Sequence, residues 1–167
     1  MLSSLPKKPP SNSARHLKIS IATQTLELFE QTFDEPPISL TSYPISSSKF
    51  GLGTEPGSNK TPLGNFFIEE KIGDGEPEQM IFKARKPTGT MASLDGDEDH
   101  ILTRILWLGG LDPENANTHD RYIYIHGTNQ EELIGRPASH GCIRMCNPDM
   151  IALFDAVETG DRVEIAA

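Results

Sequence analysis

The chain has 167 residues, a formal net charge of −9 at pH 7, 36% hydrophobic residues and 23% charged residues. This length suits one domain that buries its own core, and the 14 glycines and 13 prolines favour a loop-rich, strand-rich protein over a helical bundle. Such an acidic balance disfavours sequence-independent binding to nucleic acid or to a membrane surface, because both need clustered lysines and arginines. If the substrate is anionic, a local arginine must bind it, because the protein as a whole is acidic.

The N-terminal segment "MLSSLPKKPPSNSAR" is rich in proline, serine and lysine and has little to bury. We therefore predict a flexible tail at 1–15 and a single folded domain at 16–167. The tail lacks the apolar run of a signal peptide, and no later stretch has the length and hydropathy of a membrane span. With Met1 as the natural start, the expectation is a cytoplasmic protein; if an N-terminal leader was removed, the alternative is a periplasmic one.

Short segments of alternating hydrophobicity predict a fold built mainly from strands. Leu17, Ile19 and Ile21 alternate with polar residues before a second apolar run at 26–29, which predicts a hairpin. Further strands are expected at 38–43, 65–70, 79–84, 103–108 and 121–126. Turns with Gly and Pro separate them, and this spacing predicts a mainly β fold with one or two helices, arranged as a β-sandwich or partial barrel.

A polar insertion at 85–100 separates two of these expected strands. Asp95, Asp97 and Asp99 alternate within it as at the start of a calcium-binding loop. No bidentate glutamate follows at the twelfth position and no apolar helix flanks the segment, so the calcium interpretation is disfavoured. The expectation is a solvated acidic loop.

One helix is expected near the C-terminus. Asn147 is a suitable N-cap, and Pro148 suits the first helical position. The helix would bury one apolar stripe made of Met150, Ile151, Phe154 and Val157. Gly160 ends it, and residues 161–166 form a last predicted strand.

Both cysteines of the chain, Cys142 and Cys146, lie in one short stretch. Their separation is too small for a disulfide in most backbone conformations, which indicates free thiols. A thiol becomes nucleophilic as the thiolate, which a cation, an imidazolium or a helix N-terminus favours. Because His140, Arg144 and the predicted helix start all lie close to Cys142, the residues indicate an activated thiol.

Other residues of the same region suit acyl-transfer chemistry. Gly141 allows a tight turn in which the amides of Gly141 and Cys142 point at one oxyanion. His126, at the end of a predicted strand, is the candidate general base. His140 is only two positions from Cys142 and is better placed to line the site.

Two other interpretations stay open at this point. A structural zinc site made by His126, His140, Cys142 and Cys146 has suitable donor atoms, although the spacing is unusual and Arg144 is an unfavourable neighbour. Alternatively, Cys142 is a small buried apolar residue. The residue types and their spacing favour catalysis only slightly.

The motifs "IHG" at 125–127, "GRPASHGCIRM" at 135–145 and "TPLGNF" at 61–66 resemble the L,D-transpeptidase catalytic domain, the YkuD-type fold. The likeness extends from about residue 17 to residue 166. It implies a β-sandwich-like fold and a cysteine enzyme that acts on peptidoglycan stem peptides, at the bond between the third residue, usually diaminopimelate, and D-Ala. We expect a monomer that uses no cofactor and no metal.

The resemblance also implies a role for each motif residue. Cys142 takes the place of the nucleophile and His126 that of the base, and the Gly127 carbonyl orients His126. The oxyanion side is lined by Ser139, His140 and the amides of Gly141 and Cys142. Arg144 is expected to hold a substrate carboxylate, and Arg136 is a candidate second anion contact.

Residues outside the nucleophile motif are expected to be structural. Thr61 and Pro62 would shape a turn, and Gly64 would let the following strand approach the site. Trp107 and Tyr124 are expected in the core. Cys146 is assigned to packing.

The motif does not decide which acceptor releases the acyl group from Cys142. The polar N-terminus favours water, and hence an L,D-carboxypeptidase that trims D-Ala from free tetrapeptides during muropeptide recycling. The alternative is a periplasmic L,D-transpeptidase that forms 3-3 crosslinks between stem peptides. Outside the enzyme class, the alternative is an inactive module that binds wall peptides.

Overall fold

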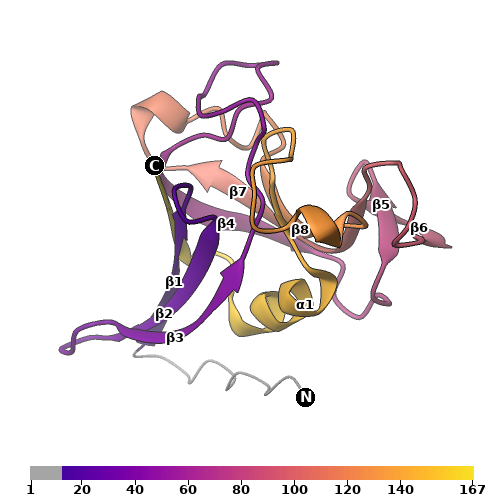
Figure 1. Cartoon of the computed structure of the whole chain (residues 1–167). Helices are drawn as coiled ribbons and strands as arrows, with labels where there is room; N and C mark the ends of the chain where they lie inside the picture. Colours follow the sequence, from indigo (N-terminus) through magenta and orange to yellow (C-terminus); the bar gives the residue numbers. More distant parts are fainter. Residues whose placement is uncertain (1–12) are drawn as a thin grey trace.

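The structure, a computed structural model, describes residues 13–167, in which one mixed sheet and one α-helix are the main elements (Figure 1). The strands are β1 (Ser13–Ser20), β2 (Thr25–Thr32), β3 (Ile38–Pro44), β4 (Gly64–Ile72), β5 (Met80–Lys83), β6 (Lys86–Met91), β7 (Ile101–Gly110), β8 (Tyr124–Gly127), β9 (Ile143–Met145) and β10 (Arg162–Ala166). The helix is α1 (Asn147–Ala156), and two short 3-10 turns are η1 (Pro113–Asn115) and η2 (Glu131–Leu133).

The strand order is β3-β2-β1-β10-β4-β7-β5-β6, and β8 and β9 extend the sheet from β7. The predicted hairpin is present as β1 and β2, where Leu17 pairs with Leu28 and Ile19 with Leu26. These alternating residues are buried because one face of the hairpin covers the core. The last strand, β10, runs parallel to β1 and antiparallel to β4.

The start of β1 corrects the predicted boundary of the tail. Ser13, Ala14 and Arg15 belong to the strand, whereas residues 1–12 of the predicted tail lie outside the described residues. Ala14 pairs with Gln31, and the buried Arg15 guanidinium donates to the Ala156 carbonyl at 2.8 Å. These long-range contacts, which composition alone does not reveal, order a segment that is polar in sequence.

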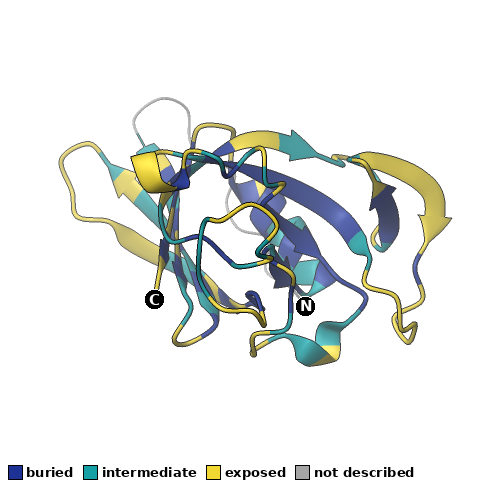
Figure 2. Ribbon diagram, turned by 90° about the horizontal axis from the view of Figure 1, so that it is seen from above, coloured by how far each residue is buried: buried dark blue, intermediate teal, exposed yellow. Residues whose placement is uncertain are grey.

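The sheet bends round one large core cluster, and two smaller clusters of buried residues lie beside β5 and β7. Residues as far apart as Leu17 on β1, Ile143 on β9 and Phe154 on α1 belong to one buried cluster. A backbone bridge between Ser46, which follows β3, and Arg144 on β9 brings the two ends of the sheet together. In Figure 2 the buried residues lie along β7, while β6 is exposed throughout. This arrangement confirms the predicted mainly β class.

Helix α1 forms where it was expected but begins differently. Cys146 is the N-cap and makes no side-chain capping bond, while Asn147 is already helical. The buried Asn147 amide instead donates to the Thr128 carbonyl at 2.9 Å and accepts from the Thr103 hydroxyl at 2.6 Å. Asn147 therefore joins α1 to β7 and to the end of β8. Within residues 13–167, no helix has the length and hydropathy needed to cross a membrane.

Candidate active site

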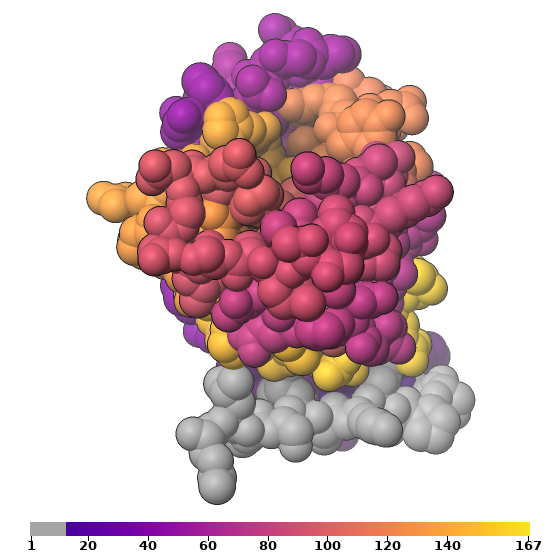
Figure 3. Space-filling view, turned by 90° about the vertical axis from the view of Figure 1, so that its right-hand side faces the viewer, coloured from indigo at the N-terminus to yellow at the C-terminus, as the bar shows by residue number. Residues whose placement is uncertain are grey.

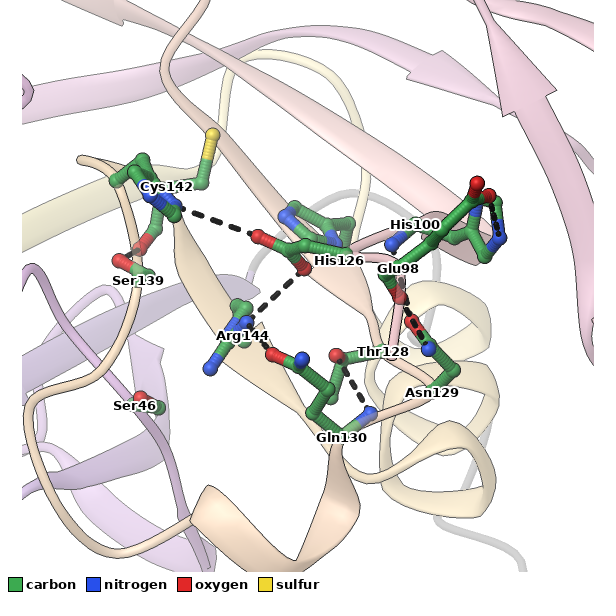
Figure 4. Close-up of polar contacts among 12 residues, drawn as sticks. Ser46, Glu98, His100, His126, Thr128, Asn129, Gln130, Ser139, Cys142 and Arg144 are labelled. Carbon is green, nitrogen blue, oxygen red and sulfur yellow. Dashed lines mark hydrogen bonds and ion pairs between the residues drawn. The ribbon is translucent and has the colours of Figure 1, made fainter. Parts of the chain in front are cut away.

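A cavity of about 290 Å³ brings together the main residues of the two histidine-containing motifs. Its lining residues are Asp99, Ile101, His126, Ser139, His140, Cys142 and Arg144. Strands β8 and β9 run parallel, and His126 pairs with Arg144, so the two motifs lie side by side (Figure 4). A larger cavity of about 850 Å³ lies along β1, β10 and the start of β4 and contains no cysteine.

The turn that carries Cys142 is fixed by hydroxyl groups. The Ser139 hydroxyl donates to the Cys142 carbonyl at 2.6 Å and accepts from the Gly141 amide at 3.3 Å. Gly141 has a φ of 121°, a conformation that side chains disfavour. Ser139 thus stabilises the turn, and in this structure the Gly141 amide binds Ser139 where sequence reasoning placed an oxyanion.

The motif at 61–66 supports this turn through Thr61. The buried Thr61 hydroxyl donates to the Gly141 carbonyl at 3.0 Å and accepts from the Ser48 amide at 3.0 Å. Gly64 has a different role from the one expected. A Cβ at Gly64 would collide with the Asp112 carboxylate, so the glycine permits close contact with the segment before η1 and not with the cavity.

His126 is held in one orientation at the end of β8. Its Nδ1 lies 2.6 Å from the Gly127 carbonyl, which can only accept a hydrogen bond, so Nδ1 carries the hydrogen and Nε2 is the basic nitrogen. Burial lowers the pKa of His126 to about 4, while the Gly127 carbonyl and Asp99 oppose the shift. The imidazole is consequently neutral at pH 7 and able to accept a proton.

Cys142 lies between two backbone groups of the segment leading into β8. Its Sγ accepts from the Tyr124 amide at 3.3 Å and donates to the Tyr122 carbonyl at 3.3 Å. Burial raises the pKa of the thiol to about 11, and the charge of Asp99 adds to this, against the effects of the Tyr124 amide, Arg144 and Arg121. The resting pair of Cys142 and His126 is therefore thiol and imidazole.

The expected activation of Cys142 by a helix N-terminus is wrong. Strand β9 separates Cys142 from α1, and desolvation outweighs the nearby cations. Arg121, which sequence reasoning did not single out, is one of these cations. It is fixed by bonds to the carbonyls of Gly53 at 3.1 Å and Lys60 at 2.8 Å.

Arg144 is buried and already paired, which corrects its expected role as an open anchor for a substrate carboxylate. Its Nη1 donates to Asp99 at 3.0 Å and to Gln130 at 2.9 Å (Figure 4). The second Asp99 oxygen lies 3.4 Å from Nδ1 of His140. Asp99 is therefore part of the site, whereas a solvated loop was expected, because a buried guanidinium needs a counter-ion. Nε and Nη2 of Arg144 are buried without a hydrogen-bond partner in the described part of the chain.

The remaining predicted residues lie outside the cavity. Arg136 is exposed and makes backbone hydrogen bonds: its carbonyl accepts from the Ser46 hydroxyl at 2.7 Å, and its amide donates to the Leu133 carbonyl at 3.3 Å. The second anion contact expected at Arg136 is therefore not part of this cavity. For the zinc alternative, residues 13–167 contain no cluster of three His, Cys, Asp or Glu side chains able to hold a metal ion. Cys146 caps α1 through its backbone, as its assignment to packing allows.

The neutral thiol predicts a pH dependence for alkylation. Because the pKa of Cys142 is raised to about 11, its reaction with iodoacetamide is expected to be slow at pH 7 and to rise about tenfold per pH unit from pH 8 to 10. Asp99→Asn should move this profile to lower pH, since Asp99 raises the pKa of the thiol. Mass spectrometry of the Cys142 peptide measures the rate, and fast labelling that is constant between pH 6 and 8 would contradict the assignment.

Comparisons with known proteins identify the family of this domain. The family model of the L,D-transpeptidase catalytic domain, YkuD, matches residues 14–165. The putative L,D-transpeptidase YqjB of Bacillus subtilis is 34% identical over 98 residues, which cover 57% of this chain and 54% of the relative. The putative L,D-transpeptidase YkuD of Bacillus subtilis is 29% identical over 150 residues, which cover 90% of this chain and 65% of the relative. Each match thus spans less than two thirds of the relative.

Solved structures show the same fold. L,D-transpeptidase 3 from Mycobacterium tuberculosis matches with a TM-score of 0.58 at 19% identity, over 93% of this chain and 62% of the other. Bd1075 from Bdellovibrio bacteriovorus matches with a TM-score of 0.58 at 16% identity, over 96% of this chain and 50% of the other. Together with the family model, these matches cover the whole β-rich domain and its cavity. The chain belongs to the L,D-transpeptidase catalytic domain family.

Proposed function

We propose that this protein cleaves the bond between the third residue and D-Ala of peptidoglycan stem tetrapeptides, through an acyl-enzyme on Cys142. One observation carries the proposal: Cys142 and an oriented, neutral His126 line the same cavity. A neutral imidazole can take the thiol proton as the sulfur attacks, which a preformed imidazolium cannot do. The family to which the chain belongs, and the names of its relatives, support this chemistry.

The reaction has two halves, and His126 moves a proton in each. In the first, Sγ of Cys142 attacks the carbonyl carbon of the third residue while Nε2 of His126 takes the thiol proton. The resulting imidazolium then protonates the D-Ala nitrogen, the C–N bond breaks, and a thioester remains. In the second half, the acceptor attacks the thioester while His126 removes its proton. The C–S bond then breaks, and the imidazolium returns the proton to Sγ, which restores the thiol.

Water is the acceptor that we propose, which makes the activity an L,D-carboxypeptidase. A cavity of about 290 Å³ lies at the lower end of the range for small-molecule sites. That volume suits the end of one stem peptide together with a water molecule better than it suits two stem peptides. The second candidate is 3-3 crosslinking by an amine acceptor, which the names of the relatives favour.

A product assay separates these outcomes. We expect a disaccharide tetrapeptide to give tripeptide and one equivalent of D-Ala, detected by mass spectrometry, even with a tenfold excess of a tripeptide that offers a free amine. If crosslinked dimer is the only product, the acyl-enzyme stands and hydrolysis is wrong. If neither D-Ala nor dimer forms, and no acyl adduct of the protein is found, the proposed function itself is wrong.

A further inference from the structure

The β5–β6 hairpin has an unusual residue at its tip. Lys83 pairs with Lys86, so Ala84 and Arg85 form a two-residue loop, with φ values of 49° and 63°. Two positive φ angles define a type I′ turn, for which Asn-Gly is the favoured sequence. Arginine at the second position adopts a conformation that glycine adopts without strain. The residue preferences of this turn type therefore do not explain why an arginine occupies position 85.

The side chain of Arg85 lies against an aromatic surface. Its guanidinium carbon is 5.1 Å from the ring centroid of Trp107 and 5.1 Å from that of Tyr122. One Nη donates to the Tyr124 hydroxyl at 3.4 Å, the only hydrogen bond of this guanidinium within residues 13–167. Since a guanidinium carries five N–H donors, several are available for a ligand. Tyr122 itself is 52% exposed.

This surface adjoins the nucleophile. Tyr122 and Tyr124, two of the three aromatic partners of Arg85, are the residues whose backbone groups hold Sγ of Cys142, each at 3.3 Å. Tyr122 also has a positive φ of 57°, so both residues of the Arg85–Tyr122 contact hold strained backbone. Figure 3 looks onto this side, where the hairpin lies below a hollow bordered by the segment that leads into β8.

The charges around Cys142 make Arg85 the accessible cation. Arg144 is buried and bound to Asp99, and Arg121 is fixed by backbone carbonyls. Arg85 is only half-buried, and the carboxylate that acts on it is Glu70, which is itself bound to His119 at 2.9 Å. Arg121 is half-buried as well, but its Nη groups are bonded to backbone carbonyls. Of these three arginines, Arg85 therefore has the most unused donors for an anionic group of a ligand that extends from Cys142 over Tyr122.

We propose that Arg85, with Trp107 and Tyr122, forms a carboxylate subsite that binds the side-chain carboxylate of the residue on the acyl side of the scissile bond. This inference rests on the proposed function, because it assigns that residue of the stem peptide to the surface beside the sulfur. The planar guanidinium binds the carboxylate through paired N–H donors, and the rings keep it in place. The subsite selects the free carboxylate over its carboxamide.

The test compares Arg85→Gly and Arg85→Lys with the wild type. Glycine is a preferred residue of this turn, so Arg85→Gly should keep or raise the melting temperature. We expect it to raise KM for the carboxylate peptide about 10- to 100-fold with kcat within about threefold, because a hydrogen bond to a charged group contributes a binding free energy of this size. KM for the carboxamide peptide should not change, and Arg85→Lys should restore part of the loss. Lys86→Ala, which removes a charge from exposed β6, is the matched control.

A binding measurement keeps this inference separate from the proposed function. Calorimetry on the Cys142→Ala protein, with and without Arg85→Gly, measures the dissociation constants of both peptides without turnover. If the wild type is inactive yet the carboxylate peptide needs Arg85 to bind, the subsite stands and the proposed function fails. If the folded Arg85→Gly protein binds and turns over both peptides as the wild type does, the subsite is wrong.

Discussion

Replacing Cys142 by alanine is expected to lower kcat/KM for D-Ala release by about 10⁴-fold or more, because no other group in the cavity can form the thioester. The cavity contains this thiol together with hydroxyl, carboxylate, imidazole and guanidinium groups. Intact-mass spectrometry should show a peptide adduct on the wild type that is absent from Cys142→Ala. Melting temperature checks that the variant is folded.

Cys146→Ala is the matched control for this variant. It also removes a thiol, from a residue that caps α1 through its backbone and does not line the cavity. We expect the control to keep activity within about twofold. Residual D-Ala release by Cys142→Ala at a tenth of the wild-type rate would rule out the covalent mechanism.

Replacing His126 by glutamine is expected to lower kcat about 10²- to 10⁴-fold, the range for loss of a general base. The effect should be large because burial raises the pKa of Cys142 to about 11, so that few thiolates exist at pH 7 unless a base takes the proton. The wild type should lose activity only as the pH falls through about 4, where His126 becomes protonated in the free protein.

The pH profile of His126→Gln distinguishes a lost base from a disturbed fold. Without the imidazole, activity should rise with pH as hydroxide produces thiolate, with a slope of about one log unit per pH unit. His16→Gln on β1, outside the cavity that contains Cys142, should behave as the wild type does. An unchanged rate for His126→Gln would transfer the role of base to His140.

The strands with alternating or long apolar patterns could be predicted from the sequence, and two others could not. β1 buries every second residue from Arg15 to Ile19, and β2 does so at Leu26 and Leu28, so their period is visible. β9 has only three residues, all buried, and β6 is exposed throughout and contains Pro87 and Gly89. Neither has the period of a half-buried strand, and both depend on pairing with distant neighbours.

The residues of the site also include some that could be predicted from the sequence and one that could not. Cys142 and His126 were predictable because each lies in a distinctive local motif, and the parallel pairing of β8 with β9 brings those motifs together. The role of Asp99 was not predictable, because its position opposite Arg144 depends on the hydrogen bonds that hold the loop in place. The Asn129 side chain accepts from the His100 amide at 2.9 Å and donates to the Gly96 carbonyl at 3.3 Å. No local pattern encodes such a contact.

The closure of the sheet has a consequence for how the protein folds. β1 pairs with β10, Leu17 against Val163, and the bridge between Ser46 and Arg144 joins the first third of the chain to the strand that follows the nucleophile. Contacts between such distant parts of a chain carry a large loop-closure entropy and make folding slow. We therefore expect β8 and β9, which lie close in the sequence, to pair first, and the segment around Ser46 to close over Arg144 only after both halves of the chain have met.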